Sequence, residues 1–176
     1  MFQYIFVAIN MIIFTPLFSI LIIIAGIFDS QKITTGYLVR LWARSILKFS
    51  NIKYSLEGFN DLDFKKKYVI ISNHQSGIDI LLTFAIFPMP ISFFTKKELF
   101  YIPIFGLAMK YAGMIPVDRR NKEKSKKSID IAVSKIHSTN LSFLNYPEGK
   151  RTDFDRLGHF KKGGFILAIK SGLPII

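Results

Sequence analysis

The clearest indication of the fold of this chain is the stretch Tyr68-Val69-Ile70-Ile71-Ser72-Asn73-His74-Gln75-Ser76-Gly77-Ile78-Asp79. Its first four residues form a short apolar run typical of a fully buried strand, and the apolar residues 80–87 that follow are typical of a helix. The loop between them carries a histidine and, five positions later, a carboxylate. An imidazole takes up protons near neutral pH, and a carboxylate can hold its tautomer and stabilise the imidazolium. The stretch therefore predicts a strand, a site loop and a helix in succession.

The same residues permit a purely structural interpretation. Ser76 and Asp79 stand three positions apart before an apolar run, which fits a capping box at a helix start. Asp79 would then serve the backbone, and His74 would be an ordinary loop residue. The sequence has no cysteine and no Gly-x-Ser-x-Gly motif to offer a nucleophile. If His74 is a base, we expect the nucleophile that it activates to belong to the substrate.

Composition narrows the class of partner. The 176 residues suit one domain with a sizeable core, and half of them are hydrophobic. Lys and Arg number 24 against 12 for Asp and Glu, which gives a formal charge of +12. Such an excess favours nucleic acid, an acidic membrane surface or a phosphorylated substrate. The absence of cysteine excludes disulfides and is compatible with a reducing compartment.

The N-terminus favours a membrane. Residues 1–28 carry no charged side chain, and 5–28 form a nearly continuous apolar run. A helix of that length measures about 36 Å, enough to cross a hydrocarbon core of about 30 Å. The run lacks the basic start and the small-residue cleavage site of a signal peptide, so we expect a retained anchor. Pro16 is predicted to kink or split the run, which leaves two short helices in one leaflet as the alternative to a full span.

Residues 35–49 are predicted to form an amphipathic helix. One face carries Leu38, Leu41, Trp42 and Ile46, and another carries Arg40, Arg44 and Lys48. This pattern fits a helix in the headgroup layer of a membrane, or a surface helix that covers the core. Basic residues follow the apolar run and none precede it, so we expect the remainder on the cytoplasmic side of the inner, cytoplasmic membrane. We expect a membrane anchor over 1–49 and a second domain over 50–176.

Beyond residue 50, short apolar strands alternate with helices. Such alternation predicts an α/β fold with a mixed, largely parallel sheet flanked by helices, after an N-terminal membrane helix or helical hairpin. The chain ends inside an apolar run, so we expect a domain incomplete at its C-terminus. The expected strands are 68–71, 91–95, 114–117, 141–144 and 173–176, and the expected helices are 78–87, 105–112, 128–139 and 163–171, with a basic connection over 119–127.

Three later segments have the composition of an anion site. The first, 113–119, ends in Arg119; the second, 146–152, is Tyr-Pro-Glu-Gly-Lys-Arg-Thr; the third, 160–164, is Phe-Lys-Lys-Gly-Gly at a predicted helix N-terminus, where free N–H groups attract anions. Each also fits a solvated loop. Their shared position after predicted strands favours a ligand site, because open α/β sheets bind ligands there.

Together these segments resemble the glycerolipid acyltransferases, especially the 1-acylglycerol-3-phosphate (lysophosphatidic acid) acyltransferases. Residues 73–79 are similar to the family's Asn-His-x4-Asp block, and 113–119 to a block that ends in Asp-Arg. Residues 146–152 resemble Phe-Pro-Glu-Gly-Thr-Arg-Ser, and 173–175 the start of a fourth block, Val-Pro-Ile. The resemblance covers roughly residues 50–176. Lys150, Tyr146 and Pro116 depart from the family pattern.

The resemblance implies an enzyme of phospholipid biosynthesis that moves an acyl group onto the free hydroxyl of 1-acylglycerol 3-phosphate and gives phosphatidic acid. His74 would act as the base and Asp79 would orient it. The acyl donor would be a co-substrate, acyl-CoA or acyl-carrier protein, with no metal and no bound cofactor. The implied substrate-binding residues are Arg119, Arg151 and Lys96, which would hold the acceptor phosphate, and Glu148 and Gly149, which would shape the acceptor site.

Two other functions compete with this one. A sister acyltransferase would use glycerol 3-phosphate or another lysolipid. A membrane-tethered basic binding module, without enzymatic activity, would explain the charge and the anchor but not a histidine and a carboxylate beside a Pro-Glu-Gly-x-Arg turn. The implied partners are therefore a phospholipid membrane, a lysophospholipid and an acyl donor, and not nucleic acid.

Overall fold

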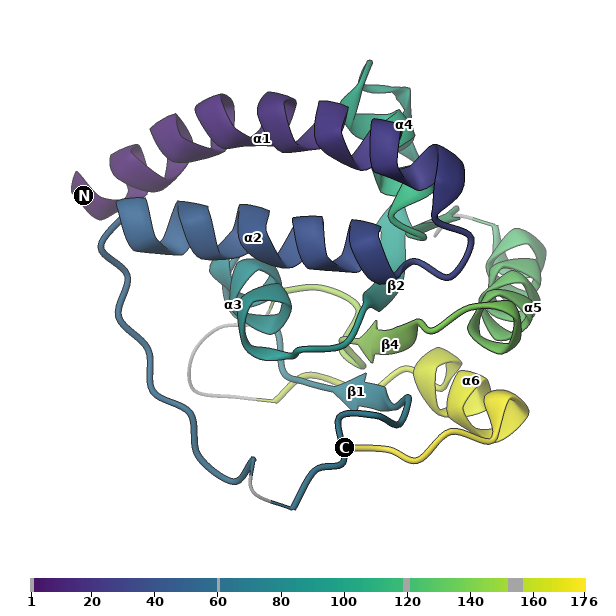
Figure 1. The fold of residues 1–176 in the computed structure, drawn as a ribbon. Coiled ribbons are helices and arrows are strands. Elements are labelled where there is room, and N and C mark those ends of the chain that lie inside the picture. Colours follow the sequence, from purple (N-terminus) through teal and green to yellow (C-terminus); the bar gives the residue numbers. More distant parts are fainter. Residues whose placement is uncertain (1, 60, 119–120, 152–156) are drawn as a thin grey trace.

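A parallel four-stranded sheet lies at the centre of the molecule (Figure 1). The computed structural model describes residues 2–59, 61–118, 121–151 and 157–176. The predicted α/β architecture is confirmed, and all three strand pairings are parallel. Ile175 makes an isolated parallel bridge to Val69. The strands are β1 (Val69–Ile71), β2 (Ile91–Lys96), β3 (Ile115–Val117) and β4 (Ser142–Asn145), in the order β1-β4-β2-β3.

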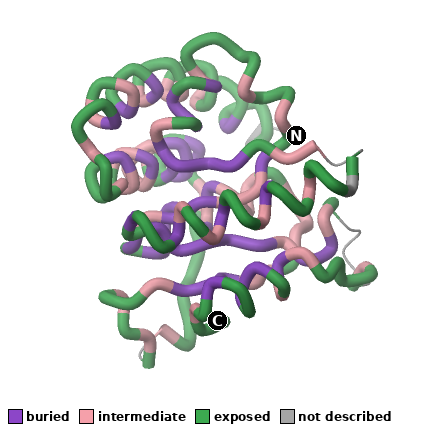
Figure 2. The backbone as a smooth tube through the Cα atoms, turned by 90° about the vertical axis from the view of Figure 1, so that its right-hand side faces the viewer, coloured by how far each residue is buried: buried purple, intermediate pink, exposed green. Residues whose placement is uncertain are grey.

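Helices cover both faces of this sheet. Leu144 and Ile91 pack into a cluster with helices α1, α2, α3 and α4, whereas Phe143 and Val69 pack with α5 and α6 on the other face. Figure 2 shows the buried residues along the middle of the molecule and the exposed residues along its outside. The helices are α1 (Phe2–Phe28), α2 (Ile33–Phe49), α3 (Ile78–Ile86), η1 (Lys97–Tyr101, a 3₁₀ helix), α4 (Phe105–Tyr111), α5 (Lys122–Ser138) and α6 (Gly163–Ser171).

The N-terminal helices form an antiparallel hairpin on one side of the molecule (Figure 1). Helix α1 runs through Pro16 as one gently curved helix, so the expected split does not occur. Proline removes one backbone hydrogen bond, but packing against α2 holds both halves in line. The indole Nε1 of Trp42 donates to Thr15 Oγ1 (3.1 Å), and the Phe14 ring lies 5.3 Å from that of Phe49. By length and composition, α1 is the one helix in the described ranges suited to crossing a membrane.

The basic side chains of α2 have a different role from the one expected in the headgroup layer. Helix α2 lies between α1 and α3, and Arg40 donates to the carbonyl groups of Phe87 and Pro88. Arg44 donates to the Ala85 carbonyl (2.8 Å). These cations meet the carbonyl groups at the C-terminal end of α3, where the helix dipole favours positive charge. The two arginines thus fasten α2 to the core, and the expectation of a helix that covers the core describes α2 better.

Helix α5 begins six residues before the predicted start at Ser128. The Asn121 side chain accepts the N–H of Lys124 (3.0 Å) and caps the first turn. The Ser125 hydroxyl then donates to the Asp118 carbonyl, and the Ser128 hydroxyl donates to the Pro116 carbonyl. These two hydrogen bonds tie the helix to the end of β3. A run of lysines favours a helix almost as strongly as leucine does, so the basic connection continues as helix once it is capped.

Candidate active site

All four strands deliver their C-terminal ends to one edge of the sheet, because they are parallel. The loop after β1 carries His74, β2 ends in Lys96, β3 leads into Asp118, and the residue after β4 is Tyr146. Segments that are far apart in the sequence therefore meet at this edge, which is where open α/β sheets bind ligands. Of the residues predicted for the site, Arg119 lies outside the described residues.

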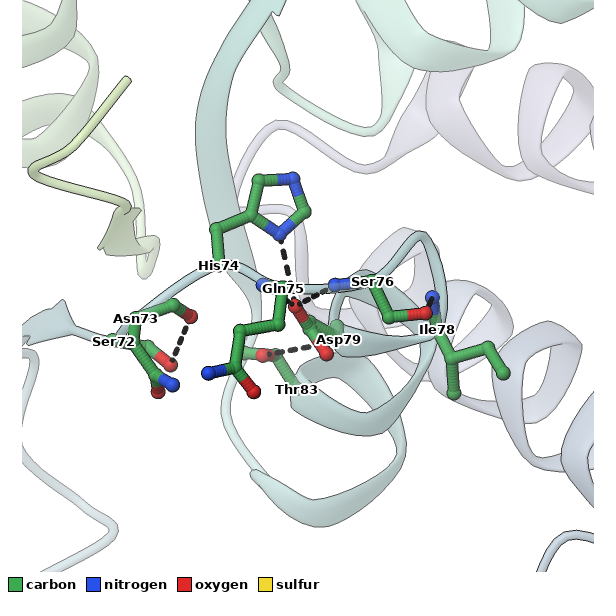
Figure 3. A network of polar contacts seen from close by, with 8 residues as sticks. All are labelled: Ser72, Asn73, His74, Gln75, Ser76, Ile78, Asp79 and Thr83. Atoms are coloured by element: carbon green, nitrogen blue, oxygen red, sulfur yellow. Dashed lines mark hydrogen bonds and ion pairs between the residues drawn. The ribbon is translucent and has the colours of Figure 1, made fainter. Parts of the chain in front are cut away.

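His74 and Asp79 form the centre of the site (Figure 3). The imidazole Nδ1 lies 3.0 Å from Asp79 Oδ2, and both side chains are largely buried. The same carboxylate oxygen accepts the backbone N–H groups of Gln75 (2.7 Å) and Ser76 (2.8 Å). Asp79 therefore holds the loop backbone at the start of α3 and orients the histidine at once. These contacts are compatible with both the structural and the chemical interpretation of Asp79.

Proton positions on His74 follow from this contact. A carboxylate accepts hydrogen bonds, so Nδ1 donates its proton to Asp79 Oδ2. The other ring nitrogen, Nε2, then carries the free lone pair of a neutral imidazole. Figure 3 shows Nε2 pointing away from Asp79, and His74 lines the cavity described below. The ring is thus placed to take a proton from a group in that cavity.

Tyr146 stacks on the histidine, a contact that the sequence did not predict. Its ring lies 4.2 Å from the His74 ring, with 18° between the planes. Burial, opposed by nearby Thr83 and reinforced by the charge of Asp79, raises the pKa of Tyr146 to about 12. The phenol is therefore neutral at physiological pH and does not act as a base. The available signal was its position after β4, the strand paired with β1.

A cavity of about 700 Å³ opens beside His74. Of the predicted substrate-binding residues, Lys96, Gly149 and Arg151 line it, together with Lys150 and Lys161. The rest of the wall is largely apolar. A cavity with both characters suits an amphiphile that has an anionic head and a hydrocarbon chain. The apolar side chains of the wall are Ile80, Phe93, Phe94, Leu99, Val117, Ile129, Leu144 and Pro147.

Glu148 supports the turn after β4 rather than the cavity wall. Its side chain is buried, and Oε2 accepts the N–H of Gly158 (2.6 Å). The next residue, Gly149, has a φ of +71° that favours glycine, and a Cβ atom there would lie 2.7 Å from Lys161 Nζ. This glycine lets the lysine of the third basic segment approach the turn that carries Arg151. The structure thus brings two of the predicted anion segments together.

An ion pair joins η1, which follows β2, to the residue that follows β3. Lys97 Nζ lies 2.6 Å from Asp118 Oδ2, and this hydrogen bond raises the pKa of Lys97. The pair links η1 to the residue that precedes Arg119.

In the described ranges, no group of three histidine, cysteine or carboxylate side chains is placed to hold a metal ion.

Comparison with known proteins places the chain in one family. The family model described as "Acyltransferase" matches residues 47–176. A chloroplastic 1-acyl-sn-glycerol-3-phosphate acyltransferase of Arabidopsis thaliana is 33% identical over 141 residues, which cover 80% of this chain and 39% of the relative. The 1-acyl-sn-glycerol-3-phosphate acyltransferase of Pseudomonas aeruginosa is 29% identical over 80% of this chain and 55% of its own length. The chain thus spans about half the length of these relatives.

The fold has a counterpart among solved structures. The crystal structure of the 1-acyl-sn-glycerophosphate (LPA) acyltransferase PlsC from Thermotoga maritima superposes with a TM-score of 0.76. The match covers 98% of this chain and 70% of that one, at 17% sequence identity. At this level of identity the likeness concerns the fold, and it includes the N-terminal helices that lie before the family match.

Proposed function

The chain belongs to the acyltransferase family, and on this premise we propose that it transfers a fatty acyl group to the free hydroxyl of 1-acylglycerol 3-phosphate. The donor is a thioester, acyl-CoA or acyl-carrier protein, and the product is phosphatidic acid for phospholipid synthesis. The observation that carries the proposal is the 3.0 Å contact between His74 Nδ1 and Asp79 Oδ2 at the wall of a cavity with apolar and cationic sides.

The geometry supports a base-assisted mechanism. His74 Nε2 takes the proton of the acceptor hydroxyl as its oxygen attacks the thioester carbonyl carbon. Asp79 stabilises the imidazolium that forms. The tetrahedral intermediate then collapses, the carbon–sulfur bond breaks, and the imidazolium returns its proton to the departing thiolate. No acyl-enzyme is formed, because the acceptor itself is the nucleophile, and the residues of the chain supply all the proton transfers.

Substrate position follows from the two sides of the cavity. Lys96 and Arg151 lie on its cationic side, where a phosphate monoester would gain charge-assisted hydrogen bonds. We assign the acceptor phosphate to these two residues and to Arg119. The apolar wall that includes Phe93 and Leu99 would take an acyl chain. Gly149 and Glu148 would contribute by shaping the turn that carries Arg151.

We propose that α1 attaches the protein to the inner, cytoplasmic membrane, with residues 50–176 on the cytoplasmic side. Little of α1 is buried, and basic residues crowd its C-terminal flank. The packing of α1 along α2 supports insertion into one leaflet rather than a full span. A span would draw α2 into the hydrocarbon, although its arginines are bonded to the core.

The test is acyl transfer from a radiolabelled acyl thioester to 1-acylglycerol 3-phosphate, by the full chain in lipid vesicles. His74→Ala should reduce turnover by about 10²–10⁴-fold, the usual worth of general-base catalysis. His137→Ala is the matched control, because His137 is an exposed histidine at the end of α5.

Near-normal turnover by folded His74→Ala protein would refute the mechanism. Glycerol 3-phosphate and other lysophospholipids, offered in parallel, separate the proposed acceptor from those of a sister acyltransferase. A chain that binds anionic vesicles but transfers no acyl group to any of them would instead fit the non-enzymatic binding module.

A further inference from the structure

A second apolar surface lies beside α1, on residues 97–107, which comprise η1 and the start of α4. These residues form a continuous stretch of the chain, here called the η1–α4 segment. Phe100 and Phe105 pack against the core, whereas the other large apolar side chains are exposed. Tyr101 is 75% exposed, a larger fraction than for any other tyrosine in the described ranges. The other exposed apolar side chains of the segment are Leu99, Ile102, Ile104 and Leu107.

The backbone of the segment is strained where it turns. Ile104 has φ 62° and ψ −56°, and the N–H of Phe105 donates to the Pro103 carbonyl (2.6 Å). This is a γ-turn of the rare positive-φ type, which is unfavourable for a β-branched residue. Ile104 combines this strain with an exposed side chain. In water, the strained backbone and the exposed apolar side chain of Ile104 both make the folded state less stable.

The segment is continuous with the apolar face of α1. Figure 1 shows α4 beside the C-terminal half of α1, on the side of the molecule away from β1 and the C-terminus. The two helices touch closely, because a Cβ atom on Gly26 would lie 2.6 Å from Tyr111 Cβ. On α1, Ile20, Ile24 and Ile27 are exposed in the same half of the helix as Gly26. Exposed apolar side chains are therefore carried by two elements that pack against each other.

Positive charge gathers next to this apolar surface. Lys135 donates to the Gly113 carbonyl, and burial together with repulsion from Lys32 and Lys110 lowers the pKa of Lys135. Three ammonium groups thus lie near the α1–α2 turn and the end of α4. Apolar surface bordered by lysines is complementary to a bilayer that contains anionic lipids.

The segment also reaches the candidate active site. Leu99 belongs to η1, is exposed at the surface and lines the cavity beside His74. Lys97 of the same helix is paired with Asp118, which holds η1 against the end of β3. The same short helix therefore borders both the outer apolar surface and the cavity.

We infer that the η1–α4 segment inserts into the bilayer as a second membrane contact, next to α1, and forms the lipid side of the cavity entrance. An acyl chain would pass from the bilayer along Leu99 to the apolar wall without crossing water. The inference rests on the proposed function, because it presumes a substrate held in a membrane. It explains why a strained turn keeps apolar residues at the surface, since the bilayer removes them from water.

The natural chain has no cysteine, so a single introduced cysteine can carry a fluorophore such as NBD at one known site. We would label Tyr101→Cys and Leu107→Cys in the segment, Ile20→Cys on α1, and Ile131→Cys on α5 as the matched control. Their natural side chains are 75%, 46%, 49% and 55% exposed, so none of the labels needs a space in the core. The full chain is bound to phosphatidylcholine–phosphatidylglycerol vesicles with and without nitroxide-labelled lipid.

We expect the nitroxide lipid to quench the labels at 20, 101 and 107 several-fold more strongly than the label at 131. If the labels at 101 and 107 behave like the one at 131 while the label at 20 is quenched, the inference is wrong and the α1 attachment stands. If no label is quenched, the membrane contact of the η1–α4 segment and the attachment through α1 are both rejected. Quenching at 101 and 107 without quenching at 20 would support the segment as a membrane contact and reject α1.

Discussion

Asp79 has two partners, the imidazole of His74 and the backbone of the loop before α3. One carboxylate oxygen receives all three hydrogen bonds from these groups. At the scale of a single residue, function and stability are therefore joined, and a substitution has to separate charge from shape. Asparagine does so, because it keeps an acceptor oxygen of similar size but has no charge.

Asp79→Asn should leave the fold intact and reduce turnover by orders of magnitude, because the imidazolium loses its counter-charge and the tautomer is no longer imposed. The comparable change in a serine protease triad costs about 10⁴ in kcat. Asp130→Asn, an exposed aspartate paired with Lys170 on the other face, is the control. Turnover and thermal unfolding are measured for both variants, and equal turnover would reduce Asp79 to a helix cap.

Tyr146 should act on His74 through its ring and not through its hydroxyl. That hydroxyl is buried, and Thr83 lies near it but outside hydrogen-bond geometry. Tyr146→Phe keeps the stacked ring and should change turnover little. Tyr146→Leu removes the ring and should reduce kcat about tenfold, since aromatic pairs are worth about 0.5–1.5 kcal/mol beyond their buried area.

An observation that needs no turnover checks the same contact. In NMR spectra, the ring current of Tyr146 should shift the His74 ring protons upfield in the natural protein and in Tyr146→Phe, but not in Tyr146→Leu. A histidine shift that is unaffected by leucine would show that the stacking is absent in solution.

At the scale of elements, α2 is held at its start by Asp29. This carboxylate accepts the N–H of Ile33 (3.1 Å) and both the N–H (2.8 Å) and the hydroxyl (2.9 Å) of Thr35. Burial opposes the charge, but the hydrogen bonds from Thr35 and Ile33, together with Lys32, lower the pKa of Asp29 from 3.8. Asp29 thus satisfies first-turn N–H groups that the helix leaves unpaired.

Asp29→Ala should lower the free energy of unfolding in detergent by about 1 kcal/mol at neutral pH, the usual worth of a helix cap. Because the folded pKa is below the unfolded one, this stability is present above about pH 4 and is lost as the pH falls through the folded pKa. The difference between the natural protein and the variant should therefore shrink in acid. A difference that is constant from pH 7 to pH 2 would contradict the assignment.

An ion pair and a hydrogen bond between neighbouring elements support the candidate active site. Lys97 and Asp118 connect η1 to β3, and Arg44 connects α2 to the end of α3. Helix α3 in turn carries Asp79. Helix α3 thus links the N-terminal hairpin of α1 and α2 to the candidate active site, so both belong to the same packed unit.

At the scale of the whole molecule, an exposed apolar surface adjoins the edge of the sheet that carries the candidate active site. Helix α1 and the η1–α4 segment form the first, and the C-terminal edge of the parallel sheet forms the second. Leu99 belongs to both, because it lies at the surface and in the cavity wall. This arrangement suits a substrate with one end in a bilayer and the other among cations.

The sequence by itself determined the features that depend on neighbours along the chain. The strand, loop and helix around His74 and Asp79 follow from an apolar run and a five-residue spacing, because a carboxylate in the first turn of a helix reaches the loop before it. The apolar helix α1 follows from composition alone. These features need no knowledge of which strands are adjacent.

Only the tertiary structure decided the contacts that depend on the strand order β1-β4-β2-β3. That order puts Tyr146 on His74, because β4 pairs with β1, and it brings Lys96 and Arg151 to one cavity. Packing of α2 against α3 likewise gives Arg40 and Arg44 carbonyl partners at the C-terminal end of α3, where the pattern of α2 had left both lipid headgroups and the core open. The physical reason is that a local pattern records which side chains share a face, whereas their partners are chosen by long-range packing of the whole chain.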